Sequence, residues 1–326
     1  MKKRILSLLL AVALLSLAGC KQSGGTSNPP AGQNQTGEQA QVPELPEFER
    51  YEDGVPVITV YNTASQEYEN MDAETYVMGV LAGEMRNDWP MEALKAQAIL
   101  ARTFTLKFIS EKDSMYPYAD ISTDVTEAQA YDASAVNERV RRAVEETRGE
   151  IMSYQGELPY AWVHAHAAGK TDLASVGLHF DSDPGYIRPV DSRESDLAPT
   201  SVKNWTAVFD AAEVLAAAKK TGASLEKLES IELGEKGESG RVIDLLINGE
   251  RVNAADLRVN LDSTKLKSTL LSEVSLKDGK VSFTGQGYGH GVGMSQWGAY
   301  QLASEGETGE HIVQYYFSDV SIVKAW

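Results

Sequence analysis

Residues 72–110 read DAETYVMGVLAGEMRNDWPMEALKAQAILARTFTLKFIS, and this stretch predicts two consecutive helices, at 72–86 and 90–110. Asp88 and Pro90 mark the break, because proline is tolerated in the first turn of a helix and not in its interior. Apolar residues recur at helical spacing in both segments. Each helix is therefore expected to bury one face against the rest of the chain.

Glu84 falls on the apolar stripe of the first helix, four residues after Val80 and seven after Val77. At that spacing its side chain points toward the interior. Burial disfavours the charged form of a carboxyl group and raises its pKa, which suits a general acid at neutral pH. The alternative is a glutamate in the last helical turn that leans into water or pairs with Arg86 or Arg102.

The second helix has an apolar stripe of its own, which core packing explains fully. Lys95, Gln97 and Arg102 lie on other positions of this helix. They either border the same cleft as Glu84 or form a solvated face.

Residues 285–293 read GQGYGHGVG, with a glycine at every second position. As an extended strand this run would place Gln286, Tyr288, His290 and Val292 on one face and leave the other face bare. A bare face is either a wall that a ligand approaches or a structural strand wedged under a helix. A dinucleotide fingerprint is excluded, because Val292 stands where the third glycine would be needed.

Several side chains of this region are candidates for holding a substrate. His290 either orients a sugar or Glu84 by a hydrogen bond or caps the adjoining helix. Tyr288 is a candidate for stacking on a sugar face. Ser295 and Gln296 stand at the start of that helix, where capping is the favoured interpretation.

The remaining pattern predicts a mixed α+β fold, in which the helical pair that bears the acid packs on antiparallel strands. A strand is expected at 55–61, a helix at 134–148, and two strands at 150–154 and 158–166. Asn248-Gly249 and Asp278-Gly279 predict hairpins, because these dipeptides favour tight turns with positive φ. A small α/β lobe inserted at about 195–262 is a further candidate feature.

The N-terminus predicts export. Three basic residues precede an apolar run at 5–18, which at about 14 residues is too short to span a bilayer comfortably. Leu17-Ala18-Gly19-Cys20 resembles the lipobox of bacterial lipoproteins, in which the cysteine is lipidated; the alternative is an ordinary secretory signal. Residues 1–20 are therefore expected to form a lipoprotein signal peptide, 21–47 a disordered tether, and 48–326 the folded part.

The net charge of the chain limits the classes of partner that we expect. The formal net charge is −17 and falls to about −20 once residues 1–19 are removed, so a nucleic-acid partner is not expected. The same charge disfavours lying flat on an anionic membrane. We therefore expect membrane attachment through lipidated Cys20 only, on the outer face of the bacterial cell membrane.

A metal is not expected. His164 and His166 have the spacing of a zinc-ligand pair on a strand, but a third ligand is not evident, although His179 and Asp181 follow. Strand histidines without a third partner usually serve as hydrogen-bonding groups. Cys20 is the only cysteine, so a disulfide within the chain and a cysteine zinc site are both excluded. No cofactor is expected.

Two long segments resemble signatures of one known family. The segment at 83–103, GEMRNDWPMEALKAQAILART, resembles that of the stage II sporulation protein D family, which also includes the amidase-enhancer proteins, and the glycine run resembles that family's closing signature. The resemblance covers about residue 55 to the C-terminus. It implies a peptidoglycan lytic transglycosylase that cuts peptide-stripped glycan strands, leaves 1,6-anhydromuramoyl ends and works beside a cell-wall amidase. The glutamate of the Glu-Met pair, here Glu84, is the implied catalytic acid.

The block at 164–171 departs from the family. The usual pattern is His-Ser-x-Ser-Gly-Gly-x-Thr, whereas this chain has HAHAAGKT, without two hydroxyl groups and one glycine. This change favours a second hypothesis, a non-catalytic wall-binding protein that recruits or enhances an N-acetylmuramoyl-L-alanine amidase. The candidate substrate-binding residues are Lys95, Gln97, Arg102, His164, Gln286, Tyr288, His290, Ser295 and Gln296.

Overall fold

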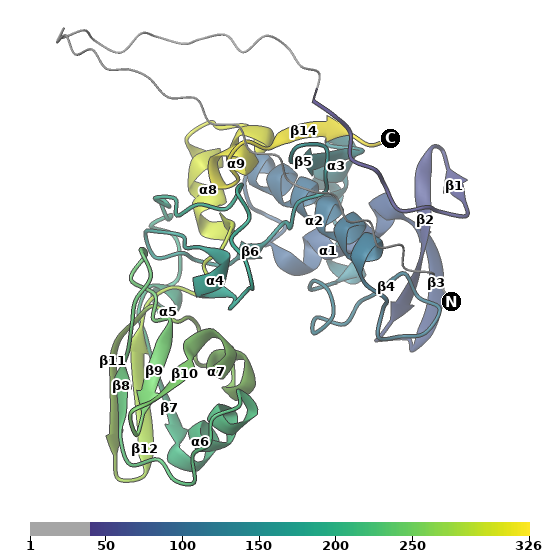
Figure 1. The fold of residues 1–326 in the computed structure, drawn as a ribbon. Helices are drawn as coiled ribbons and strands as arrows, with labels where there is room; N and C mark the ends of the chain where they lie inside the picture. Colours follow the sequence, from purple (N-terminus) through teal and green to yellow (C-terminus); the bar gives the residue numbers. More distant parts are fainter. Residues whose placement is uncertain (1–39) are drawn as a thin grey trace, which may run out of the picture. The chain divides into compact units, whose positions relative to one another are not determined.

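The computed structural model describes residues 40–326 (Figure 1), and the expected signal peptide, Cys20 and residues 21–39 of the expected tether lie outside them. Helix α2 (Met91–Glu111) is central to the larger hydrophobic core. It packs against α1 (Ala73–Glu84), α3 (Glu138–Glu146), α8 (Gln296–Ser304) and α9 (Gly309–Tyr316). Neighbouring helices approach it closely because it buries small residues at Ala93, Ala96, Ala98 and Ala101.

The two expected helices are confirmed. The Asp72 carboxylate caps α1 by accepting a hydrogen bond from the Thr75 backbone N–H at 3.0 Å. The helix ends at Glu84 because Met85 is extended, and α2 begins directly after Pro90. The helix expected at 134–148 is split into a short 3-10 turn, η1 (Ala133–Ala135), and α3. The split falls at Asn137, whose side chain caps α3 through the Val140 backbone N–H.

Small sheets flank these helices. Strands β1 (Tyr51–Glu52), β2 (Val55–Asn62) and β3 (Glu67–Asp72) are antiparallel neighbours, and β4 (Ile121–Ser122) pairs with β2 in parallel. Strand β5 (Glu150–Ser153) pairs with β14 (Ser321–Lys324), at the end of the chain. The strand expected at 158–166 is wrong except for β6 (Val163–His164), which pairs with β13 (Met294–Ser295). The preceding residues Tyr160 and Trp162 stack on each other at 4.9 Å instead of joining a ladder.

A second hydrophobic core follows α4 (Ala174–Gly177) and α5 (Thr200–Lys203). Two three-stranded antiparallel sheets and two helices build it (Figure 1): β7 (Trp205–Asp210), α6 (Ala211–Lys220), β8 (Ile231–Leu233), β9 (Asp244–Ile247), β10 (Glu250–Asn253), α7 (Ala254–Leu261), β11 (Leu271–Lys277) and β12 (Lys280–Gly285). Both expected hairpins are confirmed, with positive φ at Asn248 and Asp278. This core continues past the expected limit of 262 to Phe283, because β12 pairs with both β11 and β7.

The glycine run is not a strand with one bare face. After β12 ends, Gly287, Gly289, Gly291 and Gly293 all have positive φ, between 68° and 103°. A Cβ on Gly287 would lie 2.9 Å from the His166 carbonyl oxygen, and one on Gly289 would lie 2.6 Å from the His164 Cβ. The chain's own segments therefore occupy the space that the missing side chains leave. The run is therefore not a strand wedged under a helix, and the side of its glycines is not open to a ligand, because other segments of the chain fill that side.

The folded part begins earlier than expected, and its helices do not have the character of membrane spans. Residues 40–47 were expected in the tether, but Ser153 Oγ donates a hydrogen bond to the Gln41 carbonyl and Leu45 packs on the cluster that contains Leu106. Every helix in residues 40–326 falls short of the length and apolar character needed to cross a membrane.

Candidate active site

Glu84 is half-buried at the end of α1 and lines a pocket of about 180 Å³. Four other segments supply the remaining wall: α2, the loop after β4, the segment that leads into β6, and the glycine run. The lining residues besides Glu84 are Phe104, Ala128, Gln129, Ala161, Trp162, Val163 and His290. Glu84 and His290 thus border the same pocket, although about two hundred residues separate them in the sequence.

Two glycines of α1 allow the loop after β4 to reach Glu84. Gly79 and Gly83 are one helical turn apart, so they leave a bare stripe on the helix. A Cβ on Gly83 would lie 2.7 Å from the carbonyl carbon of Ala130, and one on Gly79 would overlap the Tyr131 ring. The loop can therefore lie directly on the helix. This contact brings the Ala130 backbone N–H to 2.9 Å from Glu84 Oε1.

Burial raises the pKa of Glu84 above its ordinary value. Two hydrogen bonds oppose this shift, because they stabilise the carboxylate: one from the Ala130 backbone N–H and one from Gln296 Nε2, which lies 3.2 Å from Oε2. Gln296 Nε2 also donates to the Glu84 carbonyl oxygen at 3.2 Å. The carboxyl group is therefore both desolvated and held in one orientation.

His290 is a neutral wall of the pocket. Its Nδ1 accepts a hydrogen bond from the Val292 backbone N–H at 3.1 Å, so the neutral ring carries its proton on Nε2, which donates to the Val163 carbonyl at 2.8 Å. Burial, followed by the nearby Arg258 and Arg241 guanidinium groups, lowers the pKa of His290 to about 3. With both nitrogens bonded to backbone, this side chain fixes the pocket edge rather than moving a proton.

His164 lies next to His290 and contacts the backbone of the glycine run. Its Nδ1 lies 3.2 Å from the Val292 carbonyl oxygen, and its ring centroid lies 5.5 Å from that of His290. Burial lowers the pKa of His164 well below its ordinary value. His164 does not itself line the pocket. It ties β6 to the glycine run.

Glu194 is an acid with a largely buried side chain, 9% exposed, that the sequence did not reveal. Its carboxylate accepts hydrogen bonds from Ser295 Oγ at 3.0 Å, from Ser192 Oγ at 2.7 Å and from the Ala167 backbone N–H at 3.0 Å. Burial raises the pKa of Glu194, while these bonds lower it. No local pattern at 191–195 signals this role, because all its partners except Ser192 are distant in sequence.

Ser295 and Gln296, which were both expected at the start of the helix, make different contacts. Ser295 caps α8, as expected, by accepting a hydrogen bond from the Gly298 backbone N–H. Gln296 instead reaches the candidate acid. Trp297 packs against Trp89, with ring centroids 4.5 Å apart.

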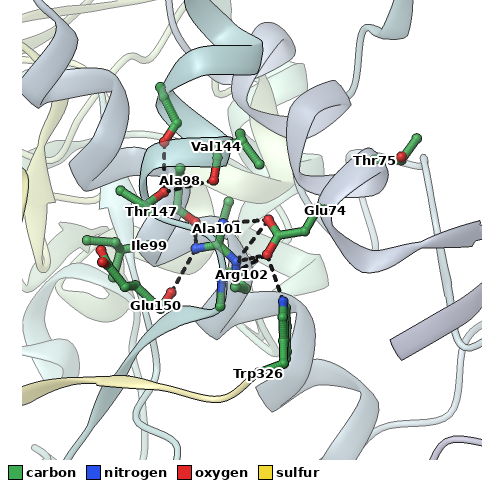
Figure 2. Close-up of polar contacts among 12 residues, drawn as sticks. Glu74, Thr75, Ala98, Ile99, Ala101, Arg102, Val144, Thr147, Glu150 and Trp326 are labelled. Carbon is green, nitrogen blue, oxygen red and sulfur yellow. Dashed lines mark hydrogen bonds and ion pairs between the residues drawn. The ribbon is translucent and has the colours of Figure 1, made fainter. Parts of the chain in front are cut away.

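Arg102 does not reach the pocket, and the expectation that it binds substrate is wrong. Figure 2 shows its guanidinium directed at the Glu74 carboxylate, with Nη2 and Oε2 2.6 Å apart. The same carboxylate accepts from Trp326 Nε1 at 2.9 Å, and Arg102 Nη1 donates to the Glu150 carbonyl at 2.7 Å. Arg102 is 1% exposed. A buried guanidinium requires a charged partner, and Glu74 provides it. This network joins α1, α2 and the C-terminus.

Four other expected substrate contacts also lie elsewhere. Lys95 Nζ pairs with Glu146 at 2.7 Å in a separate hollow, and Gln97 is fully buried on α2, away from the pocket. Gln286 Nε2 donates to Asn204 Oδ1, and the backbone of Tyr288 forms an antiparallel bridge with that of His166. Gln97 is buried because helices enclose α2, and Tyr288 belongs to the glycine run, which packs on 164–168.

Across residues 40–326, no group of three or more histidine, cysteine, aspartate or glutamate side chains is arranged to hold a metal ion. His166 Nε2 lies 3.8 Å from Glu194 Oε2, and burial lowers the pKa of His166 to about 4.

The fold and pocket define a mixed α+β protein whose Glu84 pocket holds a desolvated, oriented acid, and comparison with known proteins identifies its class. A family model described as Stage II sporulation protein matches residues 61–154, and a domain of unknown function matches residues 194–293. Stage II sporulation protein D of Bacillus subtilis is 30% identical over 282 residues, which cover 82% of this chain and 79% of that protein. An uncharacterised protein of Brachyspira hyodysenteriae is 32% identical over 81% of this chain and 70% of its own length.

The chain therefore belongs to the stage II sporulation protein D family. The amidase enhancer of Bacillus subtilis is also similar, at 27% identity over 75% of this chain and 40% of that protein. Together these relatives support a cell-wall-related function.

Proposed function

We propose that this protein is a peptidoglycan lytic transglycosylase and that Glu84 is its catalytic acid and base. The observation that carries the proposal is the environment of Glu84: a carboxyl group with a raised pKa, held by two donors, in a pocket with mainly apolar walls. A general acid at neutral pH needs these conditions.

The number of carboxyl groups favours this reaction over hydrolysis. Among the described residues that line the pocket, Glu84 is the only one with a carboxyl group. Glycosidases of the two-carboxylate type need a second carboxylate to activate water or attack the sugar. A transglycosylase needs one group that acts twice.

Both proton transfers of the reaction can be performed by Glu84. The Glu84 carboxyl gives its proton to the glycosidic oxygen as the bond from C1 of the muramoyl residue to that oxygen breaks. The resulting carboxylate takes the proton of the muramoyl 6-hydroxyl, whose oxygen bonds to C1 and closes the 1,6-anhydro ring. Glu84 ends protonated again, and no water is consumed.

The apolar wall suits a sugar substrate. Trp162 lines the pocket and is held by the parallel stack with Tyr160, at an interplanar angle of 11°, and by edge contact with Phe180. Fixed aromatic rings present apolar area at little further entropic cost.

The test compares the native protein with Glu84→Gln, a variant that keeps the size and one hydrogen-bond-accepting oxygen of the side chain but has no acidic proton to give. Peptide-stripped glycan strands are incubated with each protein, and the products are examined by mass spectrometry. The proposal expects 1,6-anhydromuramoyl ends from the native protein and at least a hundredfold less from Glu84→Gln. Equal amounts from both, or none from the native protein, would reject it.

A second candidate is a non-catalytic wall-binding protein that enhances or recruits a cell-wall amidase. Two observations favour it: the altered block at 164–171 and the similarity to a protein named amidase enhancer. It predicts that the purified protein stimulates an N-acetylmuramoyl-L-alanine amidase equally well with Glu84→Gln. In either case, we propose that lipidated Cys20 holds the protein on the outer face of the membrane.

A further inference from the structure

The Glu194 side chain joins three segments that are distant from one another along the chain or in the fold. Its Oε1 accepts hydrogen bonds from the Ala167 backbone N–H at 3.0 Å and from Ser192 Oγ at 2.7 Å. Its Oε2 accepts a hydrogen bond from Ser295 Oγ at 3.0 Å. Both oxygens of the carboxyl group therefore act as acceptors in this network.

The hydroxyl group of Ser295 has one orientation in this network. Its oxygen accepts hydrogen bonds from the Gly298 and Ala167 backbone N–H groups, both at 3.3 Å. A hydroxyl group has one hydrogen and two lone pairs, so these donors occupy the lone pairs and leave the hydrogen for Glu194. Glu194 thus keeps the Ser295 oxygen turned toward the backbone N–H group that it caps at the start of α8.

The start of α8 carries the side chain that reaches the candidate acid. Gln296 follows Ser295 and is the first residue of this helix. Its Nε2 lies 3.2 Å from Glu84 Oε2 and 3.2 Å from the Glu84 carbonyl oxygen. Both contacts depend on where the first turn of α8 lies, because the backbone there sets the point from which the Gln296 side chain extends.

The other ties of this turn lead to the same neighbouring segment. Strand β13 pairs with β6 over two residues, and the Trp297 backbone N–H donates to the Ala165 carbonyl at 3.1 Å. Glu194 binds this segment through the Ala167 N–H and the turn itself through Ser295. One carboxyl group therefore clamps both sides of the junction.

We propose that Glu194 is a positioning residue for the acid: it holds the start of α8 and so places the Gln296 amide against Glu84. Glu194 is not among the residues that line the Glu84 pocket, so it acts through Gln296 and not on the substrate. The inference rests on the proposed function for the reaction that Glu84 performs. The dependence of Glu84 on Glu194 can nevertheless be measured without turnover.

A direct effect of the Glu194 charge on Glu84 would have the opposite sign. A second negative charge disfavours ionisation of a carboxyl group, so its removal would lower the pKa of Glu84. Loss of the Gln296 donor removes a bond that stabilises the Glu84 carboxylate, and this raises the pKa. The direction of the change in the pKa of Glu84 therefore separates positioning from charge.

Glu194→Gln is the informative variant. The amide has nearly the shape of the carboxyl group, but it has one accepting oxygen where the network uses two. Either the Ala167 N–H or the Ser295 hydroxyl therefore loses its acceptor. The junction is weakened without a large change in volume.

The pKa of Glu84 is measured by NMR titration of protein that carries carbon-13 in its glutamate carboxyl groups. The signal of Glu84 is identified by its absence from Glu84→Gln. We expect the pKa of Glu84 to be higher in Glu194→Gln than in the native protein, as it should be in Gln296→Ala. On glycan strands, kcat should fall about tenfold with little change in KM, because the orientation of the acid and not substrate binding is affected.

The double variant tests whether Glu194 acts through Gln296. In protein that already carries Gln296→Ala, Glu194→Gln should not change the pKa of Glu84 further, because the amide that it positions is gone. The matched control is Glu307→Gln, which removes a charge that pairs with His311 at the surface and should leave the pKa of Glu84 unchanged. If Glu194→Gln does not fold, Ser295→Ala breaks the same link and should raise the pKa of Glu84.

A pKa of Glu84 that falls or stays the same in a folded variant would overturn the inference. A further rise when Glu194→Gln is added to Gln296→Ala would also overturn it. The expected rise without any cleavage of glycan strands by the native protein would support the inference while rejecting the proposed transglycosylase. Cleavage by the native protein, with the kcat and the pKa of Glu84 unchanged in Glu194→Gln, would do the reverse.

Discussion

Removing the Arg102 guanidinium should destabilise the fold severely. Arg102→Met leaves the Glu74 carboxylate, in a residue that is 5% exposed, with two remaining donors among residues 40–326, the Gly149 backbone N–H and Trp326 Nε1, both at 2.9 Å. Breaking one side of a buried ion pair typically costs about 3–5 kcal/mol, because the other charge remains without its partner. Urea denaturation followed by circular dichroism measures the loss. With a slope of about 3 kcal/mol per molar urea, the midpoint should fall by about 1 M or more.

The double variant Glu74→Leu/Arg102→Met separates this explanation from a simple loss of packing. It should lose clearly less than the sum of the two single variants, because no buried charge is left. Arg86→Met is the matched control, since Arg86 pairs with Asp88 at 2.8 Å on the surface and should show no measurable change. A loss below about 1 kcal/mol for Arg102→Met, or strict additivity in the double variant, would refute the reasoning.

Four further changes test the construction of the site. Gly83→Ala should push Ala130 away and reduce activity at least tenfold with a lower melting temperature, whereas an unchanged crystal structure and rate would contradict the packing argument. Gln296→Ala removes a donor to the carboxylate, so the pKa of Glu84 should rise further and the basic limb of the pH–rate profile should move to higher pH; a shift downward would show the sign to be wrong. The Glu84→Gln protein should be more stable than the native protein at pH values above 4.5, the ordinary pKa of a glutamate. The reason is that the raised pKa in the folded state makes ionisation of Glu84 unfavourable for folding. Below pH 4.5 the melting temperatures of the two proteins should converge. Ala168→Gly should raise the free energy of unfolding by up to about 1 kcal/mol, because Ala168 has a φ of 60°, which glycine adopts without strain. Denaturant titration measures this free energy, and a lower value in the variant would contradict the reasoning.

The elements that follow local rules could be predicted from the sequence. The break between α1 and α2 is encoded by Asp88 and Pro90, and the hairpins at Asn248-Gly249 and Asp278-Gly279 by turn residues that accept positive φ. The position of Glu84 also followed from spacing, because a helix fixes the direction of its side chains over several turns.

Features set by distant partners could not be predicted. Arg102 is buried because Glu74 lies against it, and neither residue shows this in its own helix pattern. The glycine run was misread because alternating glycines suit a strand as well as a chain with repeated positive φ, and only the position of 162–168 decides between them. Glu194 and Gln129 lie in irregular segments, where spacing carries no information on side-chain direction.

The most direct test of the account is cleavage of peptide-stripped glycan strands in water enriched in oxygen-18. If Glu84 acts alone as acid and base, the new muramoyl ends are 1,6-anhydro rings that contain no oxygen-18, and they disappear with Glu84→Gln. Reducing ends that carry oxygen-18 would show that water attacks the sugar, and that a second catalytic group outside the Glu84 pocket performs the reaction.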